Sequence, residues 1–224
     1  LQGRALTLTD VQATVGSVDV MAAGLLRVTN VIAGTDVSLM TTTGGIAVTN
    51  VVAGNEATLN ATAGDISSGT ITATAGAVDI DADAGDVIVG AITAGTNITI
   101  DASGVIRDGT DDAVVDLTAG GTITLTAGGN IDGPIDSVAP DDGKLDLAAG
   151  SDVTARSTAG NIALRGLGAL TLTDVQATVG SVDVMAAGLI TATKVEAGVN
   201  ATLNATAGDV IVGAITAGTN ITID

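Results

Sequence analysis

The sequence predicts an all-β protein, a parallel β-helix (β-solenoid) with about 20 residues per coil and a roughly triangular cross-section. Residues 24–43 read GLLRVTNVIAGTDVSLMTTT and residues 44–63 read GGIAVTNVVAGNEATLNATA, so that matching residues recur 20 positions apart. Apolar residues alternate with polar ones between the glycines, which is the period of a strand and not of a helix. The 224 residues include no Phe, Tyr or Trp, which favours a narrow interior filled by small aliphatic side chains.

Residues 1–23 already follow the alternation. The chain has only 2 prolines and is rich in Val, Ile and Thr, a composition that favours strands over helices. The side chains expected to point inward here are Leu6, Leu8, Val11, Ala13, Val18 and Val20.

From Gly24 onward each coil has two different halves. After Gly44 the inward side chains are expected two, four, seven and nine places on, whereas after Gly54 they fall three, five, seven and nine places on. The break between four and seven requires a corner, so we expect roughly three short strands per coil. With about 4.8 Å between stacked strands, the chain forms a body on the order of 50 Å long.

Glycines are expected at the corners between strands. A sharp bend often needs a positive φ, which glycine adopts at the lowest cost. Asn30 and Asn50 lie one coil apart and are expected to stack as a short side-chain ladder. The predicted turn glycines are Gly24, Gly34, Gly44, Gly54, Gly85, Gly95, Gly188, Gly198, Gly208 and Gly218.

The whole of 1–224 is expected to be a single solenoid segment of a longer repeat array. Regular coils are predicted for 1–104 and 148–224, and irregular, looped coils for 105–147. Within that part the regularity fails near 104–116 and 130–146. The second of these stretches holds both prolines, and proline cannot donate to a strand ladder. We therefore expect loop excursions from the coil at both places.

Long stretches recur without any change. Residues 5–25 are repeated at 169–189, and residues 84–101 at 207–224. Such identity indicates duplication of blocks of several coils, so length itself is the property that we expect to matter.

Charge and composition exclude several classes of function. A net charge of −18 argues against nucleic-acid binding and against docking on anionic lipid. No apolar run approaches the roughly 18 residues of a membrane helix, so no membrane insertion is expected. Because a solenoid end exposes unpaired backbone and core, we expect the chain to partner itself, by end-to-end or lateral stacking into a fibre.

Acidic residues are the candidates for metal binding. Asp79, Asp81 and Asp83 alternate along one predicted strand and should share its outer face, where a solvated acidic surface and a calcium site are both open interpretations. No cofactor is expected other than this possible calcium. The weak calcium candidates in the loops are Asp108, Asp111, Asp112, Asp141 and Asp142.

Ice binding and carbohydrate chemistry are two further candidate functions. Pairs such as Thr7 with Thr9 and Thr171 with Thr173 suggest an ice-binding face, although outward threonine is also the ordinary composition of a β-surface. A carbohydrate-active enzyme would need catalytic carboxylates and aromatic platforms for sugar rings, and this chain has no His, Cys or aromatic residue. The pairs Arg107–Asp108 and Asp142–Lys144 are interpreted as surface ion pairs. We expect no catalytic residues.

The segments LTAGGTITLTAGGNIDG (117–133) and LAAGSDVTARSTAGNIALRG (147–166) resemble the repeats of filamentous-haemagglutinin-type adhesins and the wider class of β-strand-repeat surface proteins of Gram-negative bacteria. This resemblance implies a right-handed β-helix, export, and a place at the cell surface or in the extracellular matrix. The function expected is therefore that of a structural, non-catalytic segment of an extracellular filament or adhesin stalk, with host, cell-surface or matrix glycans as further partners. The alternatives are a calcium-stiffened surface-binding module and an ice-binding β-solenoid.

Overall fold

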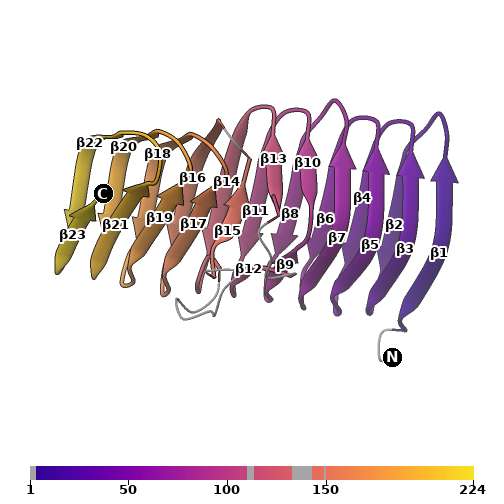
Figure 1. The fold of residues 1–224 in the computed structure, drawn as a ribbon. Coiled ribbons are helices and arrows are strands. Elements are labelled where there is room, and N and C mark those ends of the chain that lie inside the picture. The colour runs from indigo at the N-terminus through magenta and orange to yellow at the C-terminus, as the bar shows by residue number, and fades with distance from the viewer. Residues whose placement is uncertain (1–3, 110–113, 133–142, 149) are drawn as a thin grey trace.

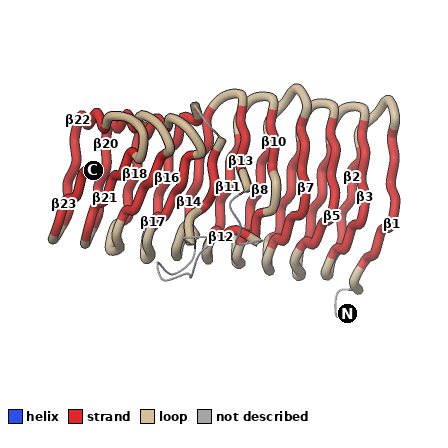
Figure 2. Tube along the Cα trace, viewed as in Figure 1, coloured by secondary structure: helices blue, strands red, loops and turns tan. Residues whose placement is uncertain are grey.

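The computed structural model describes residues 4–109, 114–132, 143–148 and 150–224. These residues form one elongated β-solenoid, with coils stacked from the N-terminal to the C-terminal end (Figure 1). Strands alternate between two sheets along the chain, and neighbouring strands within each sheet are parallel. The described residues contain no helix (Figure 2). The predicted all-β solenoid with coils roughly 20 residues apart is thereby confirmed.

Sheet A is the 13-stranded sheet and sheet B the 10-stranded sheet. The strands of sheet A are β1 (Leu6–Ala13), β3 (Leu26–Ala33), β5 (Ile46–Ala53), β7 (Ile66–Ala73), β9 (Val87–Val89), β10 (Ile92–Ala94), β12 (Ile106–Asp108), β13 (Leu117–Ala119), β15 (Leu145–Leu147), β17 (Ile162–Gly166), β19 (Val182–Ala186), β21 (Asn200–Ala205) and β23 (Asn220–Ile223). Those of sheet B are β2 (Val18–Ala22), β4 (Val37–Thr41), β6 (Ala57–Ala61), β8 (Val78–Ala82), β11 (Ile98–Ala102), β14 (Thr122–Ala127), β16 (Ser151–Ser157), β18 (Leu170–Ala177), β20 (Ile190–Ala197) and β22 (Val210–Ala217).

The core is a column of aliphatic side chains between the sheets. Alternate residues point inward along each straight part of a strand. In β5 these are Ile46 and Val48 before the bend and Val51 and Ala53 after it, and all four are at most 6% exposed. The corner expected within the longer half-coil is a bend in one strand: the β3–β5 ladder pairs Val28 with Val48 and then passes directly to Asn30 with Asn50. Most coils therefore have two strands where the sequence predicted roughly three, and only β9–β10 and β12–β13 divide the longer half.

The predicted turn glycines do lie between strands, but the predicted reason for them was wrong. Among the described glycines only Gly64, Gly143 and Gly150 have a positive φ. The corners instead stack so closely that a side chain would strike the backbone of the preceding coil. A Cβ added to Gly34 would lie 2.5 Å from the carbonyl oxygen of Thr14, well inside van der Waals contact.

Side-chain oxygens at the corners also cap the next coil. The Asp86 Oδ1 accepts a hydrogen bond from the backbone N–H of Val105 at 2.9 Å, and the Asn161 Oδ1 accepts one from that of Ser181 at 2.8 Å. The expected ladder on the strands is present too, since the Asn50 Nδ2 donates to the Asn30 Oδ1 at 2.7 Å. Asp and Asn next to corner glycines thus satisfy backbone donors that strand pairing leaves free.

Replacing Asn161 by alanine should lower the free energy of unfolding by about 1 kcal/mol, because the Ser181 N–H loses its acceptor. Urea unfolding followed by circular dichroism measures the change. Asn55→Ala is a suitable comparison, because the Asn55 side chain donates to the Asp36 carboxylate at an exposed site and accepts from no backbone N–H of the described residues. Equal losses in the two variants would contradict a capping role for Asn161.

The two halves of the solenoid are out of phase by half a coil. The eight-residue strand LTLTDVQA is β1 in sheet A, whereas its identical copy is β18 in sheet B. Likewise VDVMA is β2 in sheet B and β19 in sheet A. Each duplicated block therefore presents its surface on opposite sides of the body in its two copies.

The exchange of strand types is gradual and takes place between Ile98 and Ala177. In sheet B the strands lengthen stepwise from 5 residues in β11 to 6 in β14, 7 in β16 and 8 in β18. Sheet A changes in the opposite sense, from the 8 residues of β7 to the 5 of β17. The exchange includes the irregular region predicted at 105–147, and we call the whole stretch 98–177 the junction.

Candidate functional site

At the junction two segments of the chain pair with neighbouring residues of β17. Ile131 forms a bridge with Ile162, and Leu145 pairs with Leu164 two residues further along β17. Asp132 and Lys144 therefore both lie opposite Ala163. Asp132 has a φ of 62°, the only positive value at a described residue other than glycine. Both side chains are buried, as Asp132 is 6% and Lys144 4% exposed.

A row of charged residues crosses the outer side of sheet A here. The ladders of β15 place Asp116 next to Asp146, and Asp146 next to Arg165. The Arg165 Nε donates to the Asp146 Oδ1 at 2.5 Å, and its Nη2 contacts the other carboxylate oxygen. Asp146 is fully buried although its side chain points away from the core. A two-pronged pair of this kind is the strongest geometry for arginine and a carboxylate.

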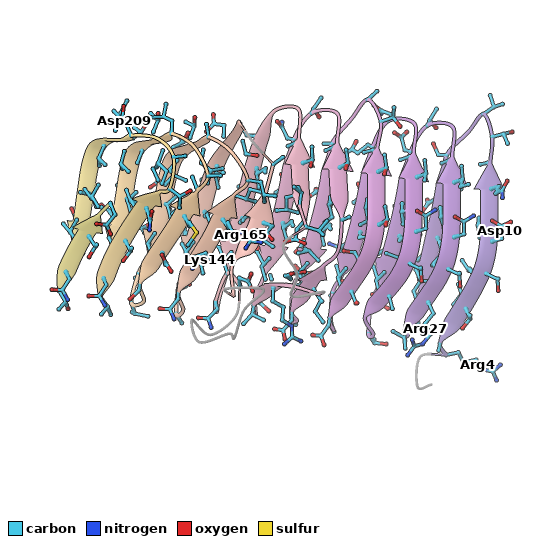
Figure 3. All side chains as sticks on the ribbon, viewed as in Figure 1. Arg4, Asp10, Arg27, Lys144, Arg165 and Asp209 are labelled. Carbon is cyan, nitrogen blue, oxygen red and sulfur yellow. The ribbon has the colours of Figure 1, made fainter. Side chains whose placement is uncertain are left out.

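A second ion pair extends across two coils. The Lys144 Nζ lies 2.9 Å from the Asp183 Oδ2, and register places Ala163 between these residues. Lys144 was predicted to form an ion pair with Asp142 at the surface. Its location at the surface is wrong, because the Lys144 side chain is only 6% exposed. Asp142 itself lies outside the described residues. Figure 3 shows Lys144 and Arg165 in the middle of the solenoid.

Asp116 is the unusual member of this cluster. It is 3% exposed, and its Oδ2 accepts a hydrogen bond from the Asp146 N–H at 2.9 Å. Burial raises the pKa of Asp116 to about 8, and the negative charges of Asp108, Asp146 and Asp132 act in the same direction. The hydrogen bond from Asp146 opposes this rise but does not cancel it. Asp116 thus keeps its proton at neutral pH.

The described residues give the calcium candidates no common site. Among them no group of three or more His, Cys, Asp or Glu side chains could hold a metal ion. Asp108 is half-buried at the end of β12, and the other loop candidates, Asp111, Asp112, Asp141 and Asp142, lie outside the described residues.

The acidic strand β8 is arranged as expected, with Asp79 and Asp81 on the outer side of sheet B and Asp101 of β11 paired with Asp81. Desolvation and repulsion from Asp101 raise the pKa of Asp79. The pKa of Asp81 is raised by desolvation first and then by its acidic neighbours. These carboxylates repel one another, and the geometry gives them no shared cation.

Outward threonines form only short rows. On sheet B, Thr99, Thr124 and Thr154 follow one another in register, whereas Asp79 precedes them. On sheet A the bend of the long strands forms an open groove of about 350 Å³ whose polar lining is Thr7, Arg27, Thr29, Thr49 and Ser67.

Comparisons with protein-family models, with curated proteins and with solved structures find no significant match. The described residues hold no helix long and apolar enough to cross a membrane. The case for a function therefore rests on the fold and on the junction.

Of the charged residues that meet at the junction, sequence reasoning singled out Asp108 and Lys144. It missed Asp116, Asp132, Asp146 and Arg165. Alternation along KLDL and NIALR does assign Asp146 and Arg165 to the outer side of their strands. Nothing in that pattern indicates that this outer side is buried. The one available signal was a basic residue at each of two neighbouring sheet A strands, Lys144 just before β15 and Arg165 within β17, in an otherwise acidic chain.

Proposed function

We propose that this chain is a structural, non-catalytic segment of an extracellular β-solenoid filament or adhesin stalk. The observation that supports it is the unbroken stacking of sheet B, in which 10 parallel strands follow one another through the junction with a local register shift at Val153 and Thr154 of β16. Each coil contacts its neighbours, so stability and length both grow with the number of coils. Exact duplication of blocks then lengthens the body without new chemistry.

The surface agrees with a role outside the cell in a crowded, ionic environment. Twenty-five acidic against seven basic residues give strong self-repulsion between separate bodies, which keeps long rods from aggregating. The groove that includes Arg27 is the place at which we propose that a hydroxyl-rich partner such as a surface glycan makes contact. Nucleic acid is not a partner in this proposal.

Localisation and shape test this proposal separately. Antibodies against residues 24–63 should label intact source cells as strongly as permeabilised ones, and labelling only after permeabilisation would refute an extracellular role. Two fused copies of the chain should appear in electron micrographs as rods about twice as long as one copy, each copy being on the order of 50 Å. Compact or bent particles would refute the role as a rigid stalk.

A further inference from the structure

The junction holds more buried charge than the rest of the described solenoid, and acidic groups predominate in it. The buried acids are Asp116, Asp132 and Asp146, and the buried or nearly buried bases are Lys144 and Arg165. We propose that the junction is a proton-dependent latch: protonated Asp116 holds the two halves of sheet A together, and loss of that proton loosens the contact between β13 and β15.

Asp116 lies where the contact between β13 and β15 depends on few interactions. Strand β13 pairs with β15 through a single residue pair, Leu117 with Leu147, which is the thinnest ladder in sheet A. Asp116 adds two contacts beside that pair: its N–H donates to the Asp146 carbonyl oxygen at 3.0 Å, and its carboxyl accepts from the Asp146 N–H. Its own carbonyl oxygen accepts from the Ile92 N–H at 2.6 Å and so continues the ladder to β10.

Ionised Asp116 would find no compensating charge among its neighbours. Three acidic residues lie near it, namely Asp108 at the end of β12, Asp132 beside the bridge residue Ile131, and Asp146 in β15. The neighbouring position on the β10 side is Ala91. The two bases are engaged elsewhere, Arg165 with Asp146 and Lys144 with Asp183. Within the described residues Asp116 takes part in no ion pair.

The direction of the pH effect follows from proton counts. Between pH 4 and pH 8 the folded chain keeps the Asp116 proton while the unfolded chain has lost it, because the pKa is raised from 3.8 to about 8. The folded state thus binds more protons, so stability falls as the pH rises through this range and levels off above it. The closed latch is the low-pH state.

Hydrogen exchange can follow the latch locally. Protection factors, which are corrected for the intrinsic pH dependence of exchange, should fall at least about tenfold between pH 6 and pH 9 in peptides covering 114–119 and 143–148. Peptides covering 46–61, within regular coils, should keep their protection. Asp116→Asn, which mimics the neutral acid and can still accept from the Asp146 N–H, should abolish the fall. Asp101→Asn, the same change at an exposed site of sheet B, should leave it intact.

Unchanged protection at the junction of the wild-type chain would overturn the latch, as would an equal fall in Asp116→Asn. If that variant does not fold, the ¹³C shift of the Asp116 carboxyl in the unmodified chain decides the matter. A titration midpoint near 8 supports the proposal, and a midpoint below 5 contradicts it. Neither result depends on the proposed extracellular role.

Discussion

Replacing Arg165 by leucine is expected to lower the free energy of unfolding by about 3–5 kcal/mol. The substitution leaves the Asp146 carboxylate, which is fully buried, without the guanidinium that contacts both of its oxygens. Most of this loss comes from leaving a buried charge uncompensated, and less of it from the net contribution of the ion pair to stability. Urea unfolding at pH 7, followed by circular dichroism, gives the difference directly.

Two further variants separate charge burial from lost packing. Arg156→Leu removes an arginine from sheet B that is 53% exposed and lies 3.2 Å from Asp174, so it should cost less than about 1 kcal/mol. The double variant Asp146→Leu with Arg165→Leu should recover most of the loss, because no charge is then stranded. If Arg165→Leu costs no more than Arg156→Leu, the buried pair does not stabilise the junction.

Alanine at Gly180 is expected to destabilise the chain by up to about 3 kcal/mol, whereas alanine at Gly16 should have little effect or stabilise it slightly. The two glycines occupy the same position of the duplicated block, so local sequence and propensity are identical. A Cβ at Gly180 would meet the backbone of Gly160 and lie 2.8 Å from the Asn161 Oδ1. A Cβ at Gly16 would meet nothing within 4 Å.

This comparison isolates the stacking of corners from conformational preference. Neither glycine has a positive φ, so backbone strain does not enter. Thermal unfolding of both variants beside the wild-type chain is sufficient. Equal melting temperatures for Gly16→Ala and Gly180→Ala would show that the corner glycines are not selected for close stacking.

Much of the fold follows from the sequence because burial in a solenoid is strictly periodic. Val51, Leu59 and Val87 each point inward at the place that the glycine spacing assigns them. The bend in the long strands was predicted as a corner for the same reason, since two successive residues there, such as Thr49 and Asn50, both face outward, which a straight strand does not allow. The role of the glycines could not be predicted in this way, because the distance between stacked corners is a property of three dimensions.

The half-coil exchange at the junction escaped prediction for a different reason, although the irregular region itself was predicted. Copies of LTLTDVQA are identical, and both sheets offer an equally narrow, aliphatic interior, so the local sequence does not specify a sheet. The phase is set by the residues between the copies. Likewise, alternation shows that Asp146 points outward, but its burial depends on how distant parts of the chain pack around it.

Cysteine pairing tests the half-coil exchange in a chain that has no cysteine of its own. In the structure the short strand β14 stacks on the lengthening strand β16, with Thr124 beside Thr154. Neighbouring positions about 4.8 Å apart are within reach of a disulfide. If short strands always stacked on short ones, Thr124 would instead lie beside Ala163 of β17. We predict that Thr124→Cys with Thr154→Cys oxidises readily to an intramolecular disulfide, and that Thr124→Cys with Ala163→Cys does not. The reverse outcome would contradict the half-coil exchange.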